Sequence, residues 1–204
     1  PTTVTHISIL DYMDTVFPNA RIAEYRNLES IFLYGLQAYI PRGVEPHLPV
    51  RLEIDTAILR SLPKLKYLVF LSFDFSTFPS EFFHMRGIEG LSLTGCLITA
   101  IPDEISNLKE LKYLAAPLNY LTSLPITMRT MDSLQVLELG NNHFSSIPTA
   151  LLGMSTLRKI DLGNFNGKAE DDWIGYLQRR PLCINHIDWE ADTAALHDVI
   201  GKAS

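Results

Sequence analysis

Residues 111–125 read LKYLAAPLNYLTSLP, and this stretch decides the fold because its spacing recurs along the chain. The segments that begin at residues 65, 88, 111, 134 and 157 carry the same apolar positions, each 23 residues after the last. A constant step of this length makes each copy one structural unit, which buries its apolar side only against the neighbouring copies. The sequence therefore predicts an array of stacked repeats over roughly residues 60–165.

Each copy contains a strand signal followed by a turn signal. The L-x-L core of a copy predicts a short strand whose alternate side chains point inward, and stacked copies place such strands in a parallel sheet about 4.8 Å apart. A later apolar column is followed in four copies by a proline: Pro79, Pro102, Pro125 and Pro148. Proline suits the first turn of a helix, so the residues after each proline are predicted to form a short helical return on the opposite side.

One column of the repeat carries polar or aromatic residues instead of leucine. Its members are Phe73, Cys96, Asn119, Asn142 and Phe165. An inward asparagine there can bond the backbone groups of the turn that leaves the sheet, which would otherwise be buried and unpaired. Cys96 is interpreted as structural at this position rather than as a nucleophile or metal ligand. Phe73 and Phe165 mark the points where the regular block gives way to its ends.

The pattern L-x-x-L-x-L-x-x-N/C-x-L-x-x-L/I-P resembles that of the leucine-rich-repeat family. The resemblance implies an α/β fold, a right-handed solenoid with a curved parallel sheet on its concave face and short helices or turns on its convex face. The length and the patterns of the flanks predict one domain over residues 1–204, with divergent repeats or a cap at 1–60, regular repeats at 61–165, and a last repeat and capping helix at 166–204. The repeats are similar to those of intracellular plant immune receptors, Ras-pathway scaffold proteins and bacterial repeat proteins.

The region before the regular block is irregular but contains strand signals. Residues 3–10, 28–33 and 51–54 each predict a strand, and the prolines and glycine of 39–50 predict a loop, so we expect two or three divergent repeats. In the first regular copy two registers are open, because the inward pair is either Leu68 with Phe70 or Leu71 with Phe73. The following Phe78-Pro79 step favours the first.

Composition argues against several classes of protein. A net charge of −6 without a basic run disfavours a general nucleic-acid binder, and no apolar run approaches the length of a membrane span. Cys96 and Cys183 do not make a disulfide framework, and no Asn-x-Ser/Thr sequon or signal-peptide pattern is present. The chain is therefore expected to be cytoplasmic, with a secreted effector as the alternative. Catalytic and metal-binding motifs are absent, so no enzyme activity, cofactor or metal is expected.

The residues between and just after the inward leucines are predicted to form a partner-binding concave face. They are Tyr67, Val69, Leu71, Ser92, Tyr113, Leu118, Glu138, Asn141, Lys159 and Asp161. Tyr67 and Tyr113 would flank a shallow trough at Gly90, Ser92 and Gly95. The later copies would form a polar margin, and an apolar centre with a polar margin is typical of protein-binding surfaces. The alternative is that these side chains merely cover one another. On the first interpretation, replacing both tyrosines by alanine weakens partner binding and leaves the melting temperature nearly unchanged.

The resemblance leaves more than one function open. A protein–protein recognition module with a protein partner is favoured, and the substrate-recognition part of a larger enzyme, such as an effector ubiquitin ligase, is the alternative. A surface adhesin is a third class, but it would require a signal peptide and disulfide caps.

Overall fold

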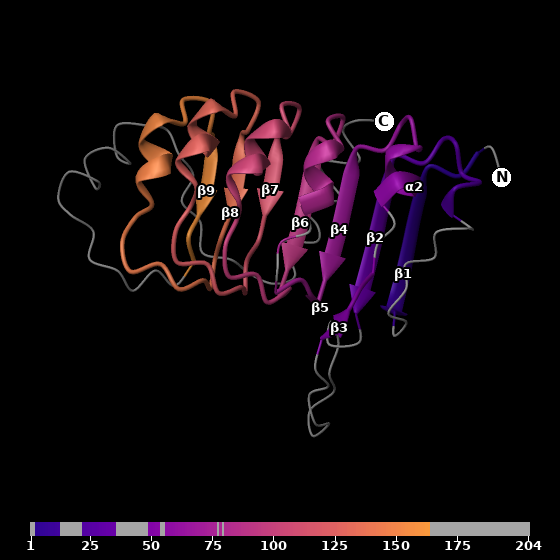
Figure 1. Cartoon of the computed structure of the whole chain (residues 1–204), viewed down its shortest axis with the longest axis horizontal. Helices are drawn as coiled ribbons and strands as arrows, with labels where there is room; N and C mark the ends of the chain where they lie inside the picture. The colour runs from indigo at the N-terminus through magenta and orange to yellow at the C-terminus, as the bar shows by residue number, and fades with distance from the viewer. Residues whose placement is uncertain are drawn as a thin grey trace, which may run out of the picture.

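The computed structural model describes residues 3–12, 22–35, 49–53, 56–76, 78 and 80–163. Within them the chain advances sideways through one parallel sheet, strand beside strand, as Figure 1 shows. The sheet contains β1 (His6–Tyr12), β2 (Ser30–Gly35), β4 (Tyr67–Leu71), β6 (Gly90–Thr94), β7 (Tyr113–Ala115), β8 (Val136–Glu138) and β9 (Lys159–Asp161). The prediction of a leucine-rich-repeat solenoid is confirmed.

Short helices follow the strands in a matching row. They are α2 (Thr56–Arg60) and the 3-10 helices η2 (Ser80–His84), η3 (Asp103–Asn107), η4 (Ile126–Thr130) and η5 (Thr149–Gly153). Pro102, Pro125 and Pro148 each lie immediately before a helix, in extended conformation with φ of −78°, −67° and −60°. Proline ends the extended stretch at a φ compatible with the turn that follows. The predicted helical returns are therefore present.

The register of the sheet reproduces the 23-residue step. Tyr67 pairs with Gly90, Gly90 with Tyr113, and the same spacing continues to Lys159 on β9. The step is 24 residues from β1 to β2, where His6 pairs with Ser30, and 37 from β2 to β4, where Ser30 pairs with Tyr67. The extra residues of the longer step lie between β2 and β4.

The prediction that residues 51–54 supply a further strand of the array is wrong. β3 (Val50–Arg51) instead pairs with β5 (Phe73–Asp74) in a separate two-stranded sheet. Because β4 already pairs directly with β2, no place for a strand is left between them. The segment pairs with β5, beyond the end of β4. Among the described residues the main sheet therefore has two divergent strands, β1 and β2.

The core lies between the sheet and the helices. Leu68 and Phe70 are 1% and 0% exposed whereas Leu71 is half-buried, so the first of the two registers is confirmed. Phe73 is also buried, and its ring packs edge-on against Phe70 at a centroid distance of 6.2 Å. An aromatic cluster of Phe70, Phe73, Phe75 and Phe82 fills this part of the core.

Some predictions lie beyond the described part of the chain. The last repeat and capping helix at 166–204, Phe165 and Cys183 lie outside the described residues, so the single domain over 1–204 stays a prediction. Among the described residues, none of the helices is both long enough and apolar enough to cross a membrane.

Candidate partner-binding face

Asparagine side chains hold the turns that leave the sheet. The Oδ1 atom of Asn119 accepts hydrogen bonds from the backbone N–H groups of Cys96 (2.9 Å) and Ile98 (3.0 Å), and its Nδ2 donates to three carbonyls, nearest that of Leu93 at 2.7 Å. Asn142 repeats part of this arrangement one copy later, where its Oδ1 accepts the N–H of Leu121 and its Nδ2 donates to two carbonyls. The predicted role of this column, satisfying buried backbone groups, is present in the structure.

Cys96 is fully buried at the same position of its repeat. Its Sγ lies 3.3 Å from the carbonyl oxygen of Thr94, to which it donates a weak hydrogen bond. Burial raises the pKa of the Cys96 thiol to about 12. A thiol that is neither ionised nor accessible is a poor nucleophile and a poor metal ligand, which supports its structural interpretation.

The turns at the strand ends adopt a left-handed backbone at one repeated position. Ser72, Gly95, Leu118 and Asn141 have φ of 61°, 61°, 56° and 55°. Glycine and asparagine tolerate this region, whereas a bulky side chain is strained in it. Leu118 therefore adopts its conformation at a cost, and so does Leu97, at φ 57° in the same group of turns.

The ten predicted site residues lie on strands or in the turns that follow them, but they are less open than expected. Six are buried, with exposed fractions of 2–8%: Tyr67, Val69, Ser92, Tyr113, Glu138 and Asp161. Four are half-buried: Leu71, Leu118, Asn141 and Lys159. The face that was predicted as an open surface is thus partly closed.

The expected trough is filled at Gly90. A Cβ atom built on Gly90 would lie 2.6 Å from the ring of Tyr67, so this ring lies directly over the glycine. Desolvation raises the pKa of Tyr67, in agreement with its exposed fraction of 8%. For this tyrosine the structure supports the alternative that the side chains cover one another.

A hydrogen-bonded network joins three successive repeats across the concave face. Tyr113 donates its phenol hydrogen to Oε2 of Glu138 (2.5 Å), and the ammonium of Lys159 donates to Oε1 of the same carboxylate (2.6 Å). Glu138 is 3% exposed and Asp161 is 2% exposed. The expectation of an open polar margin is therefore wrong for these two carboxylates, because Glu138 is enclosed by its partners and Asp161 accepts the N–H of Gly163 at 2.7 Å.

Sequence reasoning named all three residues of this network but missed their connection. Tyr113 stands on β7, Glu138 on β8 and Lys159 on β9, one strand apart each. A phenol, a carboxylate and an ammonium at adjacent repeats are complementary, and that complementarity was the available signal.

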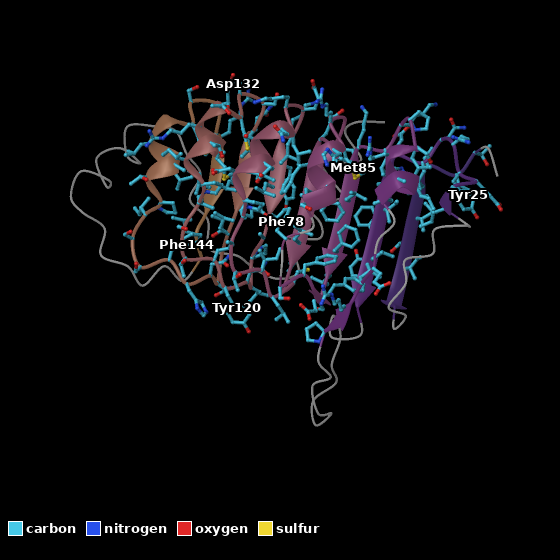
Figure 2. All side chains as sticks on the ribbon, viewed as in Figure 1. Tyr25, Phe78, Met85, Tyr120, Asp132 and Phe144 are labelled. Atoms are coloured by element: carbon cyan, nitrogen blue, oxygen red, sulfur yellow. The ribbon has the colours of Figure 1, made fainter. Side chains whose placement is uncertain are left out.

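The concave face is partly accessible at Val136 and Lys159, on β8 and β9, and along a band at the strand ends. We call this band the strand-end belt, and its half-buried members are Leu71, Ser72, Thr94, Gly95, Leu118 and Asn141. Just beyond it Tyr120 is 47% exposed, and its ring meets that of His143 edge-on at 5.2 Å. In Figure 2 Tyr120 lies at the edge of the molecule opposite Asp132. Tyr120 and His143 were not among the predicted site residues, although they occupy the same position in consecutive repeats.

Comparisons with known proteins agree with this architecture. Residues 133–154 match the family model described as Leucine Rich Repeat, and comparison with curated proteins found no match. Among solved structures, a leucine-rich-repeat protein of Leptospira interrogans is similar with a TM-score of 0.63, 21% identity and coverage of 88% of this chain and 48% of its own. An internalin of Listeria monocytogenes is similar with a TM-score of 0.59, 20% identity and coverage of 90% and 48%.

The chain thus has the leucine-rich-repeat fold, as its sequence pattern predicted. It spans about half the length of each of the two solved proteins. At these sequence identities, the similarity to the two solved structures shows the fold alone. Domains of this fold are typically recognition domains.

Proposed function

We propose that this chain is a protein-recognition module whose partner lies across the concave face and contacts the strand-end belt. The fold supports an interaction role in general. The position on the concave face is our inference from the residues described above.

The observation that carries the proposal is the network of Tyr113, Glu138 and Lys159. Removing a carboxylate from water costs several kcal/mol, and an apolar side chain at the same position is often equally or more stabilising. A solenoid selected for stability alone would not need this charge on its sheet face, whereas recognition commonly retains groups that stability does not need. The network also fixes Lys159, whose side chain is 26% exposed, in one place.

The strained turns support the same face. Leucine at a left-handed position is disfavoured by about 1–2 kcal/mol, and strained residues of this kind cluster at ligand-binding sites. Leu118 keeps its apolar side chain half-buried in the strand-end belt despite that cost. This position is where we expect a partner to make apolar contact.

The experiment compares two double variants in affinity capture from a lysate, followed by calorimetry with the purified partner. Leu71→Glu with Leu118→Glu places two charges in the belt. Ile126→Glu with Leu152→Glu places the same charges on helices, where the native side chains are 51% and 43% exposed. We expect the belt variant to lose about tenfold or more in affinity, since two buried interface leucines contribute over 1.4 kcal/mol, and the helix variant to bind normally.

The opposite pattern, binding kept by the belt variant and lost by the helix variant, would place the partner on the convex side.

Replacing Tyr67 and Tyr113 by alanine is a poorer test of partner binding than the sequence suggested. Both side chains are less than a tenth exposed, and the change deprives Glu138 of a donor, so we expect the melting temperature to fall. Cytoplasmic location, the absence of catalysis, and kinship with immune receptors or scaffold proteins stay predictions.

A further inference from the structure

We infer that a second surface, the edge of the solenoid where the strands begin, binds an acidic segment of a partner protein. We call this surface the basic rim and define it as residues 60–66, 84–89 and 107–112, the helix ends and loops that lead into β4, β6 and β7. It contains six basic residues and two glutamates, a local net charge of +4 in a chain of net charge −6. The basic residues are all exposed: Arg60, Lys64, Lys66, Arg86, Lys109 and Lys112.

One of the two glutamates is already neutralised within the rim. Glu89 lies between Lys66 and Lys112, with N–O distances of 2.8 and 2.6 Å. The two lysine side chains remain 46% and 50% exposed. Each ammonium has three N–H donors, so one contact to Glu89 leaves donors directed to solvent.

Two of the other basic residues, Arg86 and Lys109, are neighbours of like charge. Arg86 and Lys109 occupy the same position in consecutive repeats, and the strands of consecutive repeats are about 4.8 Å apart. Neither they nor Lys64 pair with any carboxylate of the described residues. Adjacent like charges repel each other, and a bound anion would relieve that repulsion.

The surroundings favour an acidic protein segment over a nucleic acid. Glu110 and Asp132 stand in the same row of loops, and the rest of the chain is strongly acidic, which repels a long polyanion. A short acidic segment can contact the rim without extending over the acidic remainder of the chain. Carboxylates three or four residues apart on a helix are about 5–6 Å from each other, which suits the step between repeats.

This surface is separate from the strand-end belt. The rim precedes the strands and the belt follows them, so the two lie on opposite edges of the sheet. In Figure 2 Asp132, in the corresponding loop of the next repeat, lies at one edge and Tyr120 at the other.

The test measures the fluorescence anisotropy of a labelled peptide with glutamates three and four residues apart, bound to the full chain at low and at physiological salt. The rim variant is Arg86→Glu with Lys109→Glu. The control combines Arg51→Glu, Ser145→Glu and Ser146→Glu, which produces the same change in net charge at exposed positions away from the rim. Melting curves verify that both variants fold.

We expect the rim variant to weaken peptide binding about tenfold and the control to change it less than about twofold, with weaker binding at higher salt. Equal losses in both variants would overturn the inference, because only net charge would then matter. A DNA duplex that binds more tightly than the peptide and is equally sensitive to the rim variant would also overturn it. So would a loss of peptide binding in the belt variant Leu71→Glu with Leu118→Glu.

Discussion

Gly95 offers a direct measure of what the left-handed turns cost. Its φ is +61°, and a Cβ atom placed on it would meet only Ser72 Oγ, at 3.8 Å. Because space is available, Gly95→Ala changes little except the backbone preference. We expect the free energy of unfolding in urea to fall by about 1 kcal/mol.

Gly87 is the matched control for that measurement. A Cβ atom on Gly87 meets nothing within 4 Å, and its backbone is not in the left-handed region. Gly87→Ala should therefore leave stability unchanged or raise it by about 0.5 kcal/mol. Equal effects of the two substitutions would show that the turn conformation carries no strain.

Asn119 should be one of the most sensitive polar residues in the chain. It is 2% exposed and satisfies backbone groups of two repeats. Asn119→Ala leaves several of these groups buried without partners, so we expect a loss of about 3 kcal/mol in the free energy of unfolding. The exposed Asn107→Ala should change it by less than about 0.5 kcal/mol. A similar, small loss in both variants would contradict the assigned role.

At the scale of elements, the charged contacts of Glu89 tie three loops together. Burial alone would raise the pKa of Glu89, but the hydrogen bonds and charges of Lys112 and Lys66 outweigh burial and lower this pKa below its ordinary value. A lowered folded-state pKa means that the contribution to stability is present above the ordinary glutamate pKa and disappears as the pH falls through the folded-state value.

Glu89→Gln should therefore destabilise the protein at neutral pH and not at strongly acidic pH. The expected difference is less than about 1 kcal/mol, because both lysines are about half exposed, and it should shrink with salt. Urea unfolding at several pH values measures it. Glu110→Gln, at an exposed residue outside these ion pairs, is the control and should show no comparable pH dependence. A constant difference across the pH range would exclude the ionic explanation.

The elements differ in how far the sequence could predict them. The strands from β4 to β9 follow from the 23-residue step, because each repeat is specified by its own leucines. β3 was misassigned because a two-residue strand carries no periodicity, and its partner, β5, lies in the turn after β4.

Across the whole molecule, the sequence predicted which side chains share a face but not how they fill it. Alternation alone places Tyr67, Tyr113 and Glu138 on the concave side. Whether a ring folds over Gly90 or a phenol reaches a carboxylate one strand away depends on side-chain rotamers and cross-strand packing. For that reason the predicted site residues lie on the expected face but are less exposed than predicted.

The same repetition predicts how damage spreads along the molecule. Leu114 is fully buried on β7, which pairs with β6 on one side and β8 on the other. Leu114→Ala should cost about 2–5 kcal/mol by leaving a cavity. Because each repeat contacts only its neighbours, hydrogen exchange should accelerate most in β6, β7 and β8 and least in β1. The exposed Leu152→Ala should change exchange little. Equal acceleration from β1 to β9 would instead show that the solenoid unfolds as one cooperative unit.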